Sequence, residues 1–116
     1  PIPRQSARTV AGIDDYGATV APARTFCLVQ EAQAMRGAGL FPHLTARDML
    51  VIDDRGNPLD NTLRFPNELA LHKVLDLLGD LTLVGRPLQA RIVAERSGHA
   101  LNHGIARAIL THIGQW

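Results

Sequence analysis

The segment LHKVLDLLGD, residues 71–80, places a histidine and two aspartates at intervals of four residues. On an α-helix, His72, Asp76 and Asp80 would lie along one ridge, within about 80° of one another. Residues four apart on a helix have Cβ atoms about 5–6 Å apart, so an imidazole and a carboxylate at this spacing can bind one zinc ion. Taken alone, the spacing favours an ordinary His–Asp hydrogen bond on a solvated helix face, because His-x-x-x-Asp is frequent by chance.

Two other segments carry polar side chains at positions where functional groups are common. RSGHALN, residues 96–102, has His99 directly after a glycine, where a predicted strand gives way to a predicted helix. Loops at such junctions often present functional groups. APARTF, residues 21–26, has Arg24 and Thr25 inside an apolar strand. Without other evidence, the first segment is an ordinary helix start and the second is an edge strand with one polar face.

The elements that would position these groups can be predicted from apolar spacing. A leucine-rich pattern predicts a helix over residues 67–81. Five apolar side chains form the stripe with which this helix would pack on a sheet: Ala70, Val74, Leu77, Leu78 and Leu81. A charge introduced into this stripe should unfold the domain.

The rest of the chain predicts a mixture of strands and helices. Compact apolar segments indicate strands at 23–29 and 48–53, and helices at 30–39 and 99–113. Less regular patterns suggest further strands at 9–10, 62–65 and 88–97, whereas residues 1–18 are the least defined. We therefore expect one domain over residues 1–116 in the α+β class, a two-layer sandwich of helices packed on one face of a mostly antiparallel sheet.

Length and composition restrict the class of protein. The 116 residues, 46% hydrophobic and 20% charged, suffice for one globular domain. No segment has the roughly 20 apolar residues of a membrane span, and the first residues lack the apolar stretch of a signal peptide. The single Cys27 fits a reducing cytoplasm. The 12 Lys and Arg residues are scattered and the net charge is +1, which argues against a nucleic-acid partner and against a helix-turn-helix over residues 97–113.

Three segments, taken together, favour a functional site over the ordinary structural interpretations given above. They are APARTF, LRFPNELALHKVLDLLGDLTLVG and SGHALN. In this order and spacing, they closely resemble the C-terminal half of the UDP-3-O-acyl-N-acetylglucosamine deacetylase family, and the similarity runs approximately over residues 19–113. The family consists of zinc-dependent enzymes of bacterial lipid A synthesis. The resemblance therefore implies a zinc cofactor and removal of the acetyl group from UDP-3-O-acyl-N-acetylglucosamine.

The resemblance also implies a role for each matching side chain. His72 and Asp76 would bind zinc. His99 would be the catalytic histidine, a general acid or electrostatic stabiliser, and Asp80 would orient it. We expect these groups to converge on one surface. Four further residues would contact the substrate or border its site: Lys73, Thr25, Phe26 and Arg96.

The sequence departs from the family pattern in three respects. Leu71 stands where the family usually has an arginine before the ligand histidine, and residues 41–49 replace a glycine-rich sequence near the acyl passage. In the family, the N-terminal domain supplies a third zinc ligand, a histidine, and an adjacent glutamate base. No such pair occurs here at His43, His103 or His112.

By this count the chain carries half an active site, which a missing N-terminal domain or a second copy would complete. We therefore expect weak zinc binding and no turnover by these 116 residues alone. The alternative is a non-catalytic nucleotide-sugar-binding or self-associating module that retains the fold. The presence of every C-terminal residue with a chemical role favours the deacetylase, located in the cytoplasm.

Overall fold

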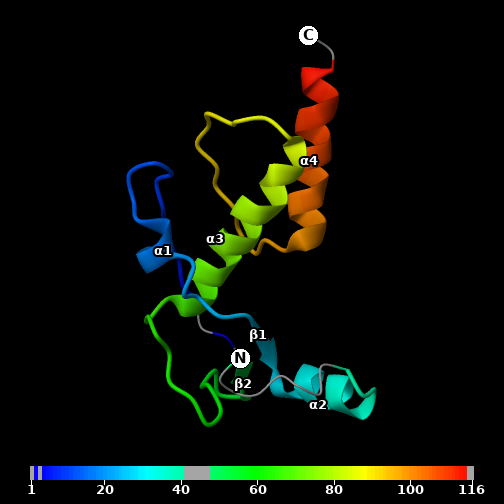
Figure 1. Ribbon diagram of the computed structural model, residues 1–116. Helices are drawn as coiled ribbons and strands as arrows, with labels where there is room; N and C mark the ends of the chain where they lie inside the picture. Colours follow the sequence, from blue (N-terminus) through cyan, green and yellow to red (C-terminus); the bar gives the residue numbers. More distant parts are fainter. Residues whose placement is uncertain (1, 3, 41–47, 115–116) are drawn as a thin grey trace. The chain divides into compact units, whose positions relative to one another are not determined.

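The computed structural model describes residue 2, residues 4–40 and residues 48–114 (Figure 1). The elements follow in the order α1 (Tyr16–Thr19), β1 (Phe26–Leu28), α2 (Val29–Gly37), β2 (Leu50–Ile52), α3 (Glu68–Leu81), a 3₁₀ turn η1 (Thr82–Val84) and α4 (His99–Ile113). The chain forms two compact units, and the boundary between them falls inside α3, after His72. None of the helices in the described part of the chain combines the length and apolarity that a bilayer crossing requires.

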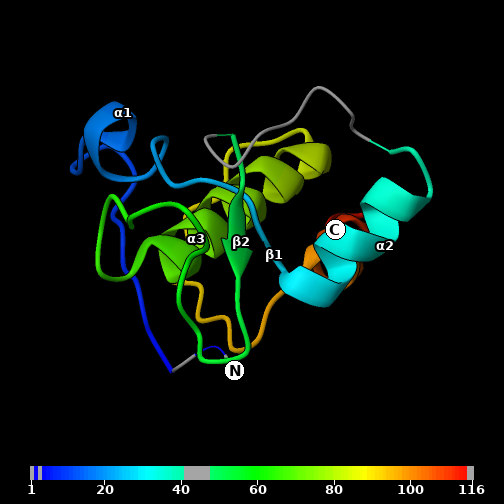
Figure 2. The same ribbon diagram turned by 90° about the horizontal axis from the view of Figure 1, so that it is seen from below.

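The first unit contains a two-stranded parallel sheet. Strands β1 and β2 pair with Phe26 opposite Leu50 and Leu28 opposite Ile52, and Figures 1 and 2 both draw them side by side. The prediction of a mostly antiparallel sheet covered by helices on one face is therefore wrong. The physical reason is the connection: α2 follows β1 directly, and a crossover through a helix returns the chain to start the next strand in the same direction.

The local sequence explains where these elements begin. The carboxylate of Glu31 accepts a hydrogen bond from the amide of Leu28 at 2.7 Å, which satisfies a free donor at the start of α2. After β2, the carboxylate of Asp53 accepts hydrogen bonds from the amides of Arg55 and Asn57. This turn brings Pro58 back beside Ile52 in an isolated antiparallel bridge. The predicted strands at 23–29 and 48–53 and the predicted helix at 30–39 are confirmed within a few residues.

The core of the first unit lies between the sheet and the start of α3. Leu50, Ile52 and Leu69 are buried together, and Phe26 and Leu28 of β1 pack against them. Leu69 is not among the five apolar residues predicted to pack on the sheet. Leu69 instead contacts the strands, because this first turn of α3 packs on the sheet, and the predicted stripe is wrong at this end.

The second unit is built from the end of α3, η1 and α4. Leu81, Val84 and Ala106 are buried together, and Leu77 and two isoleucines of α4 pack against them. The turn ends at Gly85, whose φ of 73° is a left-handed conformation that glycine adopts without strain. The helices predicted at 67–81 and 99–113 are confirmed.

Three shorter strand predictions are wrong. Residues 9–10, 62–65 and 88–97 are not in strands, and α1 lies in the N-terminal segment where no helix was expected. Within residues 88–97, the side chains of Ile92 and Val93 are 46% and 81% exposed. Their apolar side chains face no core among the described residues, so the alternation that suggested a strand has no packing to enforce it.

Candidate active site

The buried His72 is held by two neighbours in the first unit. Its Nδ1 lies 3.0 Å from the carbonyl oxygen of Ala23, and its Nε2 lies 3.3 Å from Oγ1 of Thr25. The ring of Phe26 meets the imidazole edge-on, with centroids 6.3 Å apart. His72 is only 8% exposed, so the segment of Ala23 and Thr25, together with Phe26 at the start of β1, fixes the ring.

These contacts determine which nitrogen of His72 is available to a ligand. A carbonyl oxygen only accepts hydrogen bonds, so Nδ1 carries the proton and donates it to Ala23. Nε2 is then the nitrogen that can accept a hydrogen bond or bind a metal, and it lies beside the hydroxyl of the exposed Thr25. Histidines that bind metals usually donate their other N–H to a carbonyl or carboxylate in this way. The donor set around His72 therefore fits a metal ligand.

A buried ion pair positions the segment before β1 against α3. The fully buried Glu68 accepts hydrogen bonds from the amide and from Nε of Arg24, at 3.0 and 2.8 Å, and from the amide of Arg64 at 2.6 Å. Burial alone would raise the pKa of Glu68, but these donors outweigh it and hold that pKa below its ordinary value. Arg24 stands between Ala23 and Thr25 in sequence, so the pair anchors both partners of His72.

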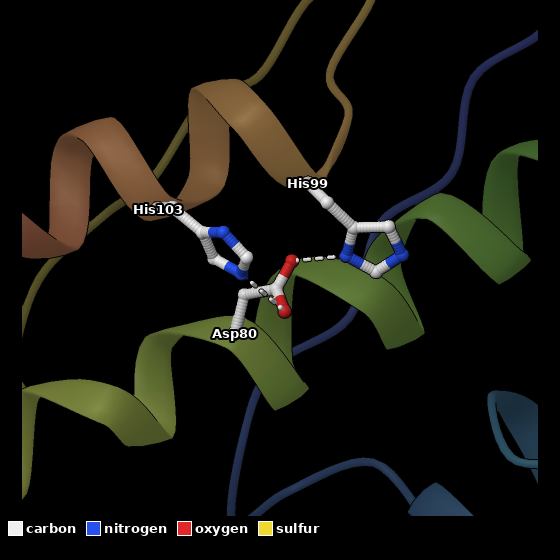
Figure 3. A group of neighbouring side chains, drawn as sticks. All are labelled: Asp80, His99 and His103. Atoms are coloured by element: carbon white, nitrogen blue, oxygen red, sulfur yellow. Dashed lines mark hydrogen bonds and ion pairs between the residues drawn. The ribbon is translucent and has the colours of Figure 1, made fainter.

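In the second unit, Asp80 is the centre of a polar cluster (Figure 3). Its carboxylate accepts a hydrogen bond from Nδ1 of His99 at 2.6 Å and from the side-chain amide of Asn102 at 3.0 Å. Nε2 of His103 lies 3.3 Å from the other carboxylate oxygen. The hydrogen bond from Asn102, and after it that from His99, lowers the pKa of Asp80. The cluster therefore contains a firmly ionised carboxylate shared by two imidazoles.

Asp76 lies one helical turn before Asp80 and faces two cationic or potentially cationic groups. Nζ of Lys73 is 3.7 Å from one carboxylate oxygen of Asp76, and Nε2 of His99 is 3.9 Å from the other. The Asp76 side chain is 11% exposed, whereas His99 is 62% exposed. His99 therefore presents its two nitrogens to two different carboxylates, Nδ1 to Asp80 and Nε2 to Asp76.

The predicted site residues fall into two groups. Thr25, Phe26 and His72 are in contact in the first unit. The second unit brings together Lys73, Asp76, Asp80 and His99. The convergence of His72 with Asp76 and His99 on one surface stays a prediction, although His72 and Asp76 lie four residues apart on the same helix.

Arg96 lies outside both groups as the structure describes them. It is exposed in the segment before α4, with a φ of 49°.

Sequence reasoning missed His103 and Asn102 as members of the Asp80 cluster. The signal was available: His103 follows His99 by four residues and Asn102 by three, and both spacings place side chains on one helix face. The expected hydrogen bond from His99 to Asp80 is present in the geometry.

Comparison with known proteins gives a family match over nearly the whole chain. The family model described as UDP-3-O-acyl N-acetylglycosamine deacetylase matches residues 1–111. The UDP-3-O-acyl-N-acetylglucosamine deacetylase of Anaeromyxobacter sp. (strain Fw109-5) is 39% identical over 113 residues, which are 97% of this chain and 37% of the relative. That of Leptospira biflexa serovar Patoc (strain Patoc 1 / Ames) is 35% identical over 109 residues, 94% of this chain and 36% of the relative. The chain thus spans about a third of the length of these curated relatives.

Proposed function

Since the chain belongs to the UDP-3-O-acyl N-acetylglycosamine deacetylase family, we propose that it carries one part of a zinc-dependent active site. This site would remove the N-acetyl group from UDP-3-O-acyl-N-acetylglucosamine in lipid A biosynthesis. The observation that carries the proposal is the fixed tautomer of His72, with Nδ1 donating to the Ala23 carbonyl and the acceptor nitrogen Nε2 beside Thr25 as the proposed metal ligand. The family and its named relatives support the substrate and the reaction.

The proposed zinc ligands are His72, through Nε2, and Asp76, through a carboxylate oxygen. Zinc accepts imidazole nitrogen and carboxylate oxygen together in catalytic sites. The spacing of four residues on α3 suits a shared ion. When bound, zinc would supply a Lewis acid that polarises the acetyl carbonyl and lowers the pKa of water.

His99 and Asp80 would handle the leaving group. In hydrolysis of the acetamide, water adds to the carbonyl carbon, the C–N bond breaks, and the departing nitrogen must gain a proton. Protonated His99 can give that proton from Nε2, because Asp80 holds the ring by its Nδ1–H at 2.6 Å. The Asp80 carboxylate also stabilises the positive charge of the imidazolium, and its lowered pKa keeps it ionised for this purpose.

Four other residues would contact the substrate or border its site. Thr25 is exposed beside Nε2 of His72, which suits a hydroxyl that faces the acetyl group. Phe26 would line an apolar part of the site next to the same ring. Lys73, with 38% of its side chain exposed, suits an anionic sugar-nucleotide, and exposed Arg96 would add a second cation.

Further ligands and a base must complete the proposed site. Catalytic zinc commonly has three protein ligands and a water, and His72 and Asp76 supply two. We propose that a domain corresponding to the remaining length of the relatives supplies the third ligand and the general base, or that a second copy does. The reaction would take place in the cytoplasm, where the buried Cys27 stays reduced.

The test is a deacetylation assay on UDP-3-O-acyl-N-acetylglucosamine, with release of acetate measured by mass spectrometry. The 116-residue chain would be assayed alone and with the separately produced N-terminal domain of the Anaeromyxobacter relative. We expect turnover only in the mixture, and loss of that turnover in His72→Ala and His99→Ala. Binding of the substrate without turnover in the mixture would favour a non-catalytic nucleotide-sugar-binding module and contradict the proposal.

A further inference from the structure

The cluster around Asp80 has the composition of a metal site that is separate from the proposed ligands His72 and Asp76. Asp80, His99 and His103 each offer one ligand atom, and these three atoms lie within 4.8 Å of one another. Figure 3 shows both rings turning a nitrogen toward the same carboxylate, His99 and His103 from α4 and Asp80 from α3. The cluster is built by two elements of one unit.

The geometry of the three side chains is close to that of a shared ion. His99 and His103 are four residues apart on α4, which places both rings on one helix face, with centroids 6.1 Å apart. Nε2 of His103 is 3.3 Å from one oxygen of Asp80, about the separation of neighbouring ligands around a tetrahedral zinc with bonds of about 2.0–2.1 Å. To admit one ion, the 2.6 Å contact between Nδ1 of His99 and Asp80 would lengthen and the His103 ring would move slightly.

The carboxylate is already oriented and ionised. The side-chain amide of Asn102, which is 2% exposed, holds one oxygen of Asp80 at 3.0 Å. This hydrogen bond is the largest reason that the pKa of Asp80 is lowered. His99 and His103 have side chains 62% and 47% exposed, so solvent can fill the remaining coordination positions.

We propose that Asp80, His99 and His103 form a second site for a divalent first-row transition-metal ion, with zinc as the ion that fits two imidazoles and one carboxylate. The site uses Nδ1 of His99, whereas the proposed deacetylase chemistry uses Nε2 of the same ring. On binding, Nδ1 exchanges its hydrogen bond with Asp80 for a bond to the metal. If the His99 ring is neutral, the proton of Nδ1 moves to Nε2. If the ring is protonated, a proton is released to solvent, so the affinity for the metal falls as the pH falls.

The test separates this site from the other proposed ligands by removing them. Zinc would be titrated calorimetrically into the His72→Ala/Asp76→Ala double variant of the 116-residue chain, at pH 7.5 and at pH 5.5. NMR of the histidine ring signals would be followed in parallel. We expect one zinc ion per chain, tighter binding at the higher pH, and shifts of the His99 and His103 signals.

Two further variants in the same background identify the ligands. His103→Asn removes one ligand while circular dichroism checks that α4 persists, and zinc affinity should fall by at least tenfold, because loss of even an outer-shell partner typically costs about 10–100-fold. His112→Asn removes another exposed histidine of α4 outside the cluster and should leave the affinity unchanged. The proposal would be overturned by equal zinc affinities in the double variant and in its His103→Asn and His112→Asn derivatives. It would also be overturned if the ring signals of His99 and His103 did not respond to zinc. Because the metal would replace the hydrogen bond between His99 and Asp80 that the proposed deacetylation uses, zinc at this site should oppose deacetylation, and the complementation assay tests deacetylation separately.

Discussion

His72 donates its Nδ1 proton to the backbone carbonyl of Ala23 at 3.0 Å, in the interior of the first unit. A backbone carbonyl cannot be removed by a side-chain substitution and cannot itself take a proton at ordinary pH. This contact therefore fixes the tautomer more firmly than an exposed carboxylate would. It leaves Nε2 beside the Thr25 hydroxyl, and the account of zinc binding rests on this nitrogen.

The first prediction concerns the ion pair that anchors the partners of His72. Glu68→Ala should lower the free energy of unfolding by about 3–5 kcal/mol, because Arg24 would be left with an uncompensated, largely buried charge. Urea unfolding followed by circular dichroism measures this change. Glu31→Ala is the matched control, since Glu31 is exposed and caps a helix at its surface. A loss at Glu68 no larger than that at Glu31 would show that the pair does not hold the unit together.

The second prediction is the pH dependence of stability. The pKa of Glu68 is lowered in the folded chain, so the folded state binds fewer protons than the unfolded state near that pKa. The stabilisation by Glu68 is then fully present above its ordinary pKa of 4.5, and it is lost as the pH falls through the lowered folded value.

Unfolding curves between pH 7 and pH 3 should therefore show a decrease in stability that is steepest at acid pH. In Glu68→Gln the decrease should be shallower, although the variant starts from a lower stability at pH 7. A Glu68→Gln curve parallel to that of the wild type would mean that other carboxylates cause the acid sensitivity.

The third prediction concerns the contact between His99 and Asp80. Asp80→Asn keeps the shape of the side chain but removes the charge that accepts the Nδ1–H. In the complemented deacetylase, kcat should fall by about 10–100-fold, as is common for partners that orient a functional histidine, while KM changes little. Asp54→Asn, at an exposed aspartate of the first unit, serves as the control. An unchanged kcat in Asp80→Asn would remove Asp80 from the proposed mechanism.

The fourth prediction concerns the core of the second unit. Leu77 packs against the buried cluster of Leu81, Val84 and Ala106, so Leu77→Asp would place an unpaired charge there at a cost of several kcal/mol. Leu83→Asp, at a leucine that is 62% exposed, should be tolerated. Thermal unfolding of the two variants measures the difference, and a Leu77→Asp variant as stable as Leu83→Asp would contradict the packing.

Local patterns predicted those elements whose spacing is enforced by the core. The helices at α3 and α4 were predictable because apolar residues recur at helical spacing over at least 14 residues. The strands β1 and β2 were predictable from short apolar runs. The predicted antiparallel sheet was wrong because the relative direction of strands depends on which strands pair, and pairing is a long-range property. The strand predicted at 62–65 suggested an antiparallel hairpin with the strand before it, although the β1–α2–β2 order already indicated a parallel pair.

The candidate site could be predicted where residues act within one helix or match a long motif. The partnership of Asp80 with His99 followed from the family resemblance and agrees with the geometry. The roles of Ala23 and Glu68 could not be predicted, because they depend on which loop packs on α3, and a carbonyl has no sequence signal. His103 has no neighbouring glutamate to mark it as part of a site, and its partner is an aspartate 23 residues earlier in the chain.

The most direct test of the zinc account is the protonation pattern of His72 itself. Long-range ¹H–¹⁵N NMR of the 116-residue chain should find His72 as the Nδ1–H tautomer without metal. On addition of zinc, its Nε2 signal should shift while the Nδ1–H is retained, and Asp76→Ala should weaken this response. A metal-free His72 protonated at Nε2, or an Nε2 signal that zinc leaves unmoved, would contradict the claim that this histidine is a zinc ligand.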